Sequence, residues 1–362
     1  MKRLFTFLGA MFLMAGSAAW AQEVDSSVPM QSSVSTDDAT MEDGEDWIPS
    51  ISLDSRFGYN RNFSDRTGGF GGDGLYLDIN GKISKRFSYS YNQRLTTEPD
   101  ESFFDATCWL TLSYEAGNFA FTAGKDALLV GSFEYDAYDL DSYYDMNTLF
   151  YNSFPAWQWG VSASWTNNAE NSTFILQAAN SPYSLTPFED NLYAYGAAWR
   201  GEWDCYESYW TVNMWEYESG KFVKALNLGN MFYAGNFSLM VDCMMQGAEI
   251  KNLFRGITVS TMPAYEFGDQ FRLFGKFGWE RNARAKAALV DILPDDITSV
   301  SDDYIFYGAG LEFFPLKEDK SLRLHAVWMT NNYTNIHALN VGLTWKFNLT
   351  SATKRLISKI KK

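Results

Sequence analysis

Apolar and polar residues alternate one by one along most of the chain between residues 47 and 349. In residues 51–59 (ISLDSRFGY), four apolar side chains occupy odd positions, while Ser, Asp, Arg and Gly occupy the even ones. A period of two residues is typical of a β-strand with one apolar and one polar face. We count sixteen such segments: 51–59, 74–84, 87–95, 103–114, 118–125, 157–166, 172–180, 192–202, 206–216, 222–233, 236–247, 254–263, 269–280, 303–314, 321–330 and 336–347.

The connections between these segments distinguish a barrel from a sandwich. Even-numbered connections are short, such as 85–86 and 234–235, whereas several odd-numbered ones are long, notably 60–73, 126–156 and 281–302. Short turns on one side and long loops on the other are typical of outer-membrane barrels. The sequence therefore predicts an all-β fold, an antiparallel transmembrane β-barrel of about 16 strands with long extracellular loops and short periplasmic turns. A soluble all-β glycan-binding protein is the alternative.

Composition excludes two other classes of protein. The net charge is −15, which disfavours a nucleic-acid binder because such a protein needs a basic surface. Beyond the first 20 residues no apolar run reaches the 18 residues that a transmembrane helix requires. Aromatic residues make up 17% of the chain, and many lie near strand ends, where Tyr and Trp suit the membrane–water interface. The last strand ends in an alternating aromatic pattern like the insertion signal of bacterial barrels.

Both ends of the chain differ in composition from the barrel at residues 47–349. Residues 1–21 combine Lys2 and Arg3, an apolar run and a small-residue cleavage site, which predicts a signal peptide. An N-terminal membrane anchor is the alternative. Residues 22–46 carry eight acids and no base, so we expect an acidic disordered segment. Residues 350–362 carry five bases and form a basic C-terminal tail that we place in the periplasm.

Three stretches of sequence resemble the phosphate-selective porin O/P family in a diverged form. They are residues 121–126 (FTAGKD), residues 271–279 (FRLFGKFGW), and residues 307–316 (YGAGLEFFPL) with the two strands that follow. The resemblance implies a sixteen-stranded barrel, often trimeric, with the third loop folded inward and anion selectivity from basic residues along the pore. Few basic residues fall on the inward parity of this chain, so we do not extend phosphate selectivity to it. They are Arg56, Lys82, Arg94, Arg200, Arg272, Lys276, Arg323 and Lys346.

The third loop, between the fifth and sixth strands, is acidic. It carries five carboxylates between residues 133 and 145 and no base between Asp126 and Phe154. We predict that it folds into the barrel, that its aromatic residues anchor it, and that its carboxylates face the water path and attract cations. The predicted pore or constriction residues are Glu134, Asp136, Asp139, Asp141, Asp145, Arg56, Lys82, Arg94, Arg272 and Lys276. A surface-exposed acidic loop with no effect on conduction is the alternative.

The most consistent function is an outer-membrane porin of a Gram-negative bacterium for small hydrophilic solutes or ions. We expect outer-membrane lipids, lipopolysaccharide and two further copies of the chain as partners, and no nucleic acid. The alternative is a closed barrel acting in adhesion or assembly, because Tyr76, Trp109, Phe274 and Phe306 point inward by parity. We expect no enzymatic activity, since neither His325 nor His337 lies in a nucleophile motif. Neither a cofactor nor a metal site is predicted, and Cys108, Cys205 and Cys243 have no metal-ligand spacing.

Overall fold

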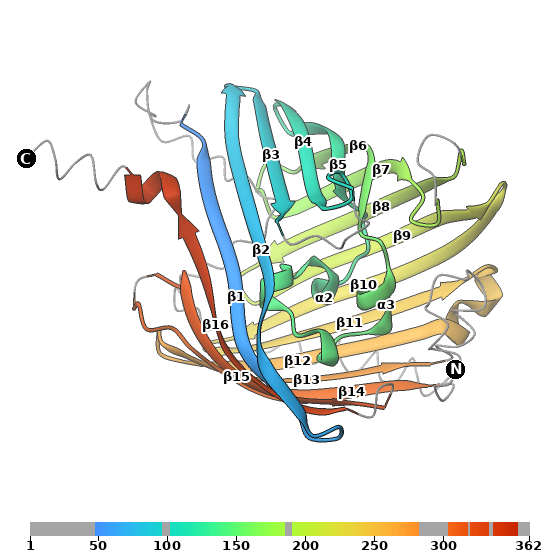
Figure 1. Cartoon of the computed structure of the whole chain (residues 1–362). Helices are drawn as coiled ribbons and strands as arrows, with labels where there is room; N and C mark the ends of the chain where they lie inside the picture. The colour runs from blue at the N-terminus through green and yellow to red at the C-terminus, as the bar shows by residue number, and fades with distance from the viewer. Residues whose placement is uncertain are drawn as a thin grey trace, which may run out of the picture. The chain divides into compact units, whose positions relative to one another are not determined.

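The computed structural model describes residues 48–95, 102–184, 190–281, 303–317, 319–332 and 336–353. Sixteen antiparallel strands, each paired with its sequence neighbours, close into a barrel through the pairing of β1 with β16 (Figure 1). The predicted fold class is confirmed. The strands are β1 Ser50–Asn62, β2 Thr67–Ser84, β3 Phe87–Arg94, β4 Thr107–Ala116, β5 Phe119–Ala127, β6 Trp157–Thr166, β7 Ser172–Asn180, β8 Tyr193–Trp203, β9 Tyr206–Glu218, β10 Lys221–Ala234, β11 Phe237–Gly247, β12 Ile257–Phe267, β13 Phe271–Glu280, β14 Tyr304–Phe313, β15 Leu322–Asn331 and β16 His337–Asn348.

Side chains alternate between the two faces of the barrel as the sequence parity predicts. In β13, Phe271 and Leu273 on the outer face are 42% and 47% exposed, while Phe274 and Lys276 on the inner face are 4% and 9% exposed. The outer surface is therefore apolar along the strands. An apolar outside and backbone hydrogen bonds that close around the barrel are what a bilayer requires of strands. Within the described residues, no helix is both long and apolar enough to cross a membrane.

The first hairpin differs from the prediction. We expected residues 60–73 to form a long connection, but Gly68–Gly72 belong to β2, and the two strands pair up to Asn62 opposite Thr67. Glycine lowers strand propensity but does not prevent pairing when a partner strand supplies the hydrogen bonds. A β-bulge between Arg56 and Phe57 of β1 leaves Asp73 of β2 without an opposite residue.

The third loop, residues 128–156 between β5 and β6, lies inside the barrel (Figure 1). It contains α2 Phe133–Asp136, the 3₁₀ turns η1 Asp139–Asp141 and η2 Tyr144–Met146, and α3 Leu149–Ser153. Ser132 and Thr148 cap the two short α-helices by accepting hydrogen bonds from the backbone N–H groups of Tyr135 and Tyr151. A further 3₁₀ segment, η3 Ile250–Gly256, precedes β12.

The buried apolar core of the molecule is the contact between the third loop and the inner wall. Each of four hydrophobic clusters contains loop residues and wall residues. Tyr143, Met146 and Leu149 pack on the β12–β16 side, whereas Leu128, Val130 and Phe150 pack on the β7–β11 side. The loop is therefore held by apolar contacts on several sides of the lumen.

The chain ends continue the barrel at one side. Residues 349–353 begin a helix after β16, and the Thr350 hydroxyl accepts a hydrogen bond from the N–H of Ile51 and donates one to the carbonyl of Pro49. The predicted signal peptide at 1–21, the acidic segment at 22–46 and residues 354–362 of the basic tail lie outside the described residues.

Candidate functional site: the third loop and the wall around it

Where the third loop leaves β5, its first residues form hydrogen bonds with polar side chains of β9 and β11. The Thr211 hydroxyl of β9 donates to the carbonyl of Val130 at 2.9 Å. Asp242 of β11, fully buried, accepts from the Ser132 hydroxyl at 2.7 Å and from the Glu134 N–H at 2.8 Å. Gly131 between them has φ +74, and a Cβ there would lie 2.6 Å from the Thr211 hydroxyl oxygen. Only glycine fits this turn without strain.

A buried ion pair holds the start of α2. The Lys276 ammonium lies 2.7 Å from the Glu134 carboxylate, and the two side chains are 8% and 1% exposed. Glu134 also accepts from the N–H of Thr148 at 3.2 Å, and the side chain of Asn147 accepts from Lys276. Nearby, Glu280 of β13 accepts from the N–H of Leu149 at 2.7 Å. Glu134 is therefore a structural contact between two parts of the loop and the wall.

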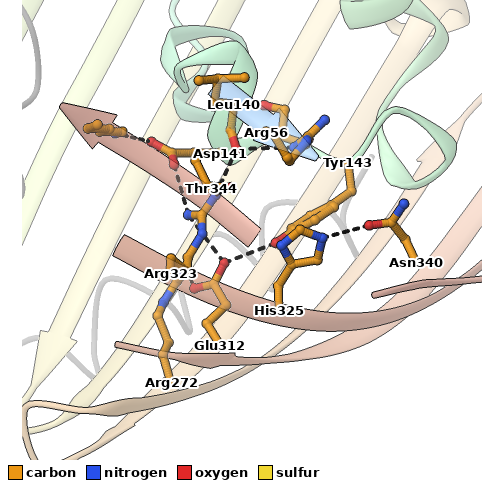
Figure 2. A network of polar contacts seen from close by, with 12 residues as sticks. Arg56, Leu140, Asp141, Tyr143, Arg272, Glu312, Arg323, His325, Asn340 and Thr344 are labelled. Atoms are coloured by element: carbon orange, nitrogen blue, oxygen red, sulfur yellow. Dashed lines mark hydrogen bonds and ion pairs between the residues drawn. The ribbon is translucent and has the colours of Figure 1, made fainter. Parts of the chain in front are cut away.

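Two arginines of the wall hold the tip of the loop, Leu140–Tyr143 (Figure 2). Arg56 of β1 donates to the carbonyls of Leu140 at 3.1 Å and Ser142 at 2.5 Å. Arg323 of β15 donates to the Leu140 carbonyl at 2.7 Å and to the Asp141 carboxylate at 2.8 Å. Because main-chain carbonyls accept these bonds, the arginines fix the position of the loop backbone.

Asp141 and Glu312 bring three basic residues together on this side of the lumen: Arg272, Arg323 and Lys346 (Figure 2). Lys346 lies 3.1 Å from Asp141, and Arg272 lies 2.9 Å from Glu312. Burial raises the pKa of Asp141, but the charges of Arg323 and Lys346 outweigh that effect and lower it below its ordinary value. Each of the two acids is therefore paired with two bases, Arg323 being shared between them.

Aromatic and imidazole rings complete this network. The Tyr143 hydroxyl donates to Glu312 at 3.3 Å, and its ring packs edge-on against His325 at 5.3 Å between centroids. The Nε2 atom of His325 lies 2.6 Å from the side-chain oxygen of Asn340 (Figure 2). His325, which is 3% exposed, is therefore part of the packing between the wall and the loop.

The β-bulge in the first hairpin places an additional acid in the site. Asp73, the residue without an opposite partner, points back to Arg56, and its carboxylate accepts from Arg56 Nε at 2.7 Å. A bulge redirects a side chain in this way. The Arg56 guanidinium thus bonds to one carboxylate on β2 and two carbonyls of the loop.

The other loop carboxylates lie nearer the edge of the loop. Asp136 pairs with Arg200 at 2.5 Å, and Arg200 stacks on Tyr209 at 3.7 Å from the ring centroid. Asp139 accepts from the hydroxyls of Tyr76 at 2.8 Å and Tyr151 at 3.1 Å.

Asp145 differs from these residues because its carboxylate has no ion-pair partner among the described residues. Its backbone carbonyl accepts from the side chain of Asn331 at 3.2 Å. Partial burial without a nearby base raises the pKa of Asp145.

The predicted site residues are not all brought together. Glu134, Asp136, Asp139, Asp141, Arg56, Arg272 and Lys276 lie in or next to the contacts between loop and wall. Arg94 lies on β3 directly opposite Tyr76, which contacts Asp139. Lys82 lies six residues further along β2 beside the 85–86 turn, about 20 Å from Tyr76 at strand spacing.

The inner wall has two different surfaces. We name β10–β16 with β1 the packed wall, because inward side chains of these strands are covered by the loop: Asn227, Asp242, Glu280, Phe306, Val327 and Ala338 are all 0–1% exposed. We name six inward residues of β4–β6 the hydroxyl-lined wall, because their side chains are small, polar and half-buried: Thr111, Ser113, Thr122, Ser162, Ser164 and Thr166. Trp109 of β4 and Gln177 of β7 also point inward but contact the loop, at Leu140 and Leu129. The loop therefore packs against one part of the wall more closely than against the other.

Several residues of the site were not singled out from the sequence. Asp242, Glu280 and Glu312 fall on the inward parity of their strands, which is a usable signal for an inward position. Parity does not reveal which loop atom a wall residue contacts. Asp242 and Glu280, for example, are each more than 100 residues from the loop residue to which they bond. Asp73 carries no signal at all, since its orientation depends on the bulge.

Among known proteins, the chain is similar in structure to outer-membrane proteins. No family model matches the chain, and no curated protein matches its sequence. Solved structures of variants of Rh. blastica porin are similar, with 12% sequence identity, a TM-score of 0.56 and coverage of 83% of this chain and 100% of theirs. A loop L8 deletion mutant of OmpT, an outer membrane protein of Vibrio cholerae, matches at 11% identity and a TM-score of 0.57, covering 84% and 100%. The chain has the barrel fold of these proteins.

Proposed function

We propose that the protein is an outer-membrane porin through which small hydrophilic solutes or ions diffuse down their gradients. One observation carries the proposal: a closed barrel, apolar outside and polar inside, holds an internal loop, and half-buried hydroxyl side chains line part of its inner face on β4–β6. A barrel of 16 strands is wide enough for an aqueous channel. The similarity of fold to Rh. blastica porin supports the same function.

The location and partners follow from this function. An outer-membrane barrel must be exported, which accords with the signal peptide expected at residues 1–21. Its apolar outer surface suits the lipids and the lipopolysaccharide of the outer membrane. We propose a homotrimer by analogy with porins. Kinship with the phosphate-selective porin O/P family rests on the three sequence stretches alone, and phosphate selectivity is not part of the proposal.

We further propose that the third loop narrows the channel and favours cations. Residues 127–156 contain five carboxylates and no Lys or Arg, so the loop is acidic. Carboxylates at a narrow point attract cations and repel anions. The loop contacts described above support an internal position for this acidic segment.

The test is conductance of the purified protein in a planar bilayer. Discrete, stable conductance steps are expected, with a reversal potential in a salt gradient that favours cations. Replacing residues 132–149 with a short Gly-Ser linker is expected to raise the conductance several-fold. A wild-type protein that inserts but never conducts rules out the porin function, and one that prefers anions rules out the role given to the loop.

A second candidate is a closed barrel that acts in adhesion or assembly. The observation in its favour is the apolar packing of the loop in four separate clusters around the wall. Absence of conductance in the wild type, together with conductance in the loop-replaced variant, is the result that this candidate predicts.

A further inference from the structure

We propose that the inner wall formed by β1, β2 and β3 binds a calcium ion between Asp54, Asp78 and Asn92. The inference goes beyond the proposed porin function, because an ion bound to the wall does not depend on whether the barrel conducts. None of these three residues takes part in the ion pairs that hold the third loop.

Asp54 and Asp78 are two acids buried close together on the inner wall. Asp54 of β1 and Asp78 of β2 are diagonal neighbours across the strand pair, and they are 7% and 6% exposed. Their carboxylates lie close enough for their charges to repel. Lys346, directly opposite Asp54 on β16, pairs with Asp141 at 3.1 Å and acts on Asp54 only from beyond ion-pair distance. Buried charges in proteins are paired with a base or coordinate a metal, and these two acids have no base of their own among the described residues.

Neutral groups donate the hydrogen bonds that these acids accept. Asp78 accepts from the side-chain amides of Asn80 and Asn92, the second at 3.2 Å. Asp54 accepts a long bond of 3.4 Å from the hydroxyl of Tyr138, which belongs to the third loop. Amides and hydroxyls orient the carboxylates but do not neutralise them. Two negative charges are therefore held side by side without compensation.

Two oxygen atoms of the same cluster have no hydrogen-bond partner among the described residues. They are Oδ1 of Asp54 and Oδ1 of Asn92, and Asn92 is 0% exposed. The Asn92 oxygen belongs to the amide group that donates to Asp78, so it lies within the cluster. The cluster thus offers carboxylate and amide oxygens without nitrogen or sulfur. Calcium prefers such oxygen ligands, completes its shell with water and tolerates irregular geometry.

The number of carboxylates sets the expected affinity. No group of three or more His, Cys, Asp or Glu side chains within the described ranges could hold a metal ion. With two carboxylates and one amide, we expect a dissociation constant of about 0.1–1 mM, in the range of extracellular calcium modules. A bound ion would join three neighbouring strands and remove the repulsion between the two acids. Because it binds the folded chain, calcium is expected to stabilise that state.

The probe for this site is the terbium ion, which binds where calcium binds and emits when a nearby tryptophan is excited. The indole of Trp109 donates to Ser90 at 2.8 Å, Ser90 donates to Asn80 at 2.5 Å, and Asn80 bonds to Asp78. A tryptophan is therefore connected to the cluster by hydrogen bonds. In nonionic detergent free of lipopolysaccharide, the full chain is expected to give saturable terbium emission that calcium displaces. Its thermal unfolding midpoint is expected to rise with calcium.

Three variants assign the binding to these residues. Asp54→Asn with Asp78→Asn is expected to weaken calcium binding at least about ten-fold and to abolish the shift in unfolding midpoint. Glu218→Gln with Glu249→Gln is the matched control, because it removes two exposed carboxylates that lie beside lysines, and it is expected to bind like the wild type. Asn92→Asp supplies a third carboxylate and is expected to bind calcium at least about five-fold more tightly. This gain tests the site even if the first variant does not fold.

Several results would overturn the site. Equal affinity in the wild type and in Asp54→Asn with Asp78→Asn would assign the ion to other acids of the chain. Displacement of terbium by magnesium as readily as by calcium would indicate a diffuse attraction, since magnesium needs a near-ideal octahedral shell. Absence of any emission that calcium displaces would also contradict the proposal. None of these measurements uses conductance, so failure here leaves the porin function intact, and a barrel that never conducts can still bind the ion.

Discussion

The packed wall and the hydroxyl-lined wall belong to one barrel with one strand geometry, yet they carry different side chains inward. The packed wall presents Arg56, Lys276, Glu280, Glu312 and Arg323, each bonded to the loop or to a residue that contacts it. The six residues of the hydroxyl-lined wall are all serine or threonine. These five charged residues of the packed wall are therefore paired or hydrogen-bonded, and their contacts fix the loop.

The loop depends on buried polar contacts, because only short helical segments hold its own structure. A helix of four or five residues is not stable alone. The wall arginines and Lys276 satisfy carbonyls and carboxylates that water would otherwise satisfy. Removal of one partner leaves the other buried and unpaired, which costs more than the pair itself contributes. The comparison between the two walls can be tested on this point.

The largest effect is expected at Lys276. Lys276→Met leaves the Glu134 carboxylate buried without its cation, so we expect a loss of about 3–5 kcal/mol in the free energy of unfolding. The measurement is urea unfolding in detergent micelles. Lys82→Met is the matched control, since Lys82 also lies on the inward parity but near the 85–86 turn; its effect is expected within about 0.5 kcal/mol.

A second variant shows whether the cost arises from the unpaired carboxylate. Lys276→Met combined with Glu134→Gln is expected to recover part of the stability lost in Lys276→Met. If the double variant is less stable than the single one, the ion pair is not the source of the effect.

Sequence parity accounts for the fold well because it is a local property. Each strand needs only its own alternation to show which face meets lipid. Four aromatic residues predicted to point inward are buried: the exposed fractions of Tyr76, Trp109, Phe274 and Phe306 are 3%, 8%, 4% and 0%. The register follows from short turns. The glycine-rich start of β2 was missed because its pairing comes from β1 and not from its own propensity.

The site was harder to predict, for a physical reason. The acids of the third loop and the bases of the wall are both visible in the sequence, but their pairing depends on how a loop of 29 residues crosses the lumen. Asp141 meets Arg323 and Lys346 across separations of 182 and 205 residues. Composition alone treats all five loop acids as equivalent, whereas the contacts separate the paired Glu134 and Asp141 from Asp139.

The next effect in size is expected at Arg56. Arg56→Lys keeps the charge but loses the planar guanidinium that reaches the Leu140 and Ser142 carbonyls and Asp73 together. We expect a loss of about 1.5–3 kcal/mol, because at least one buried acceptor becomes unpaired. Hydrogen exchange at residues 140–143 is expected to quicken in this variant. Unchanged protection there would show that the apolar clusters alone hold the loop tip.

A smaller effect is expected at Tyr143. Tyr143→Phe removes one hydroxyl that donates to the Glu312 carboxylate at 3.3 Å, while the ring contacts with Phe274 and His325 remain. Arg272 and Arg323 still pair with Glu312, so we expect a loss of only about 1 kcal/mol. Urea unfolding measures it. A loss as large as that of Lys276→Met would mean that the hydroxyl is essential to the whole network.

The smallest expected effect is a loss of stability of the loop tip at acidic pH. Arg323 and Lys346 hold the folded pKa of Asp141 below its ordinary value of 3.8, so its contribution is complete above that value and is lost as the pH falls through the folded pKa. Burial raises the pKa of Asp145, so its protonation acts in the opposite direction and removes an unfavourable buried charge on acidification. Asp141→Asn separates the two, because it removes the acid-sensitive contact at the loop tip and leaves Asp145. Protection factors for residues 140–143, compared between neutral pH and about pH 3, are expected to fall in the wild type and to change less in Asp141→Asn. An equal fall in both proteins would assign the acid sensitivity to another group on the packed wall.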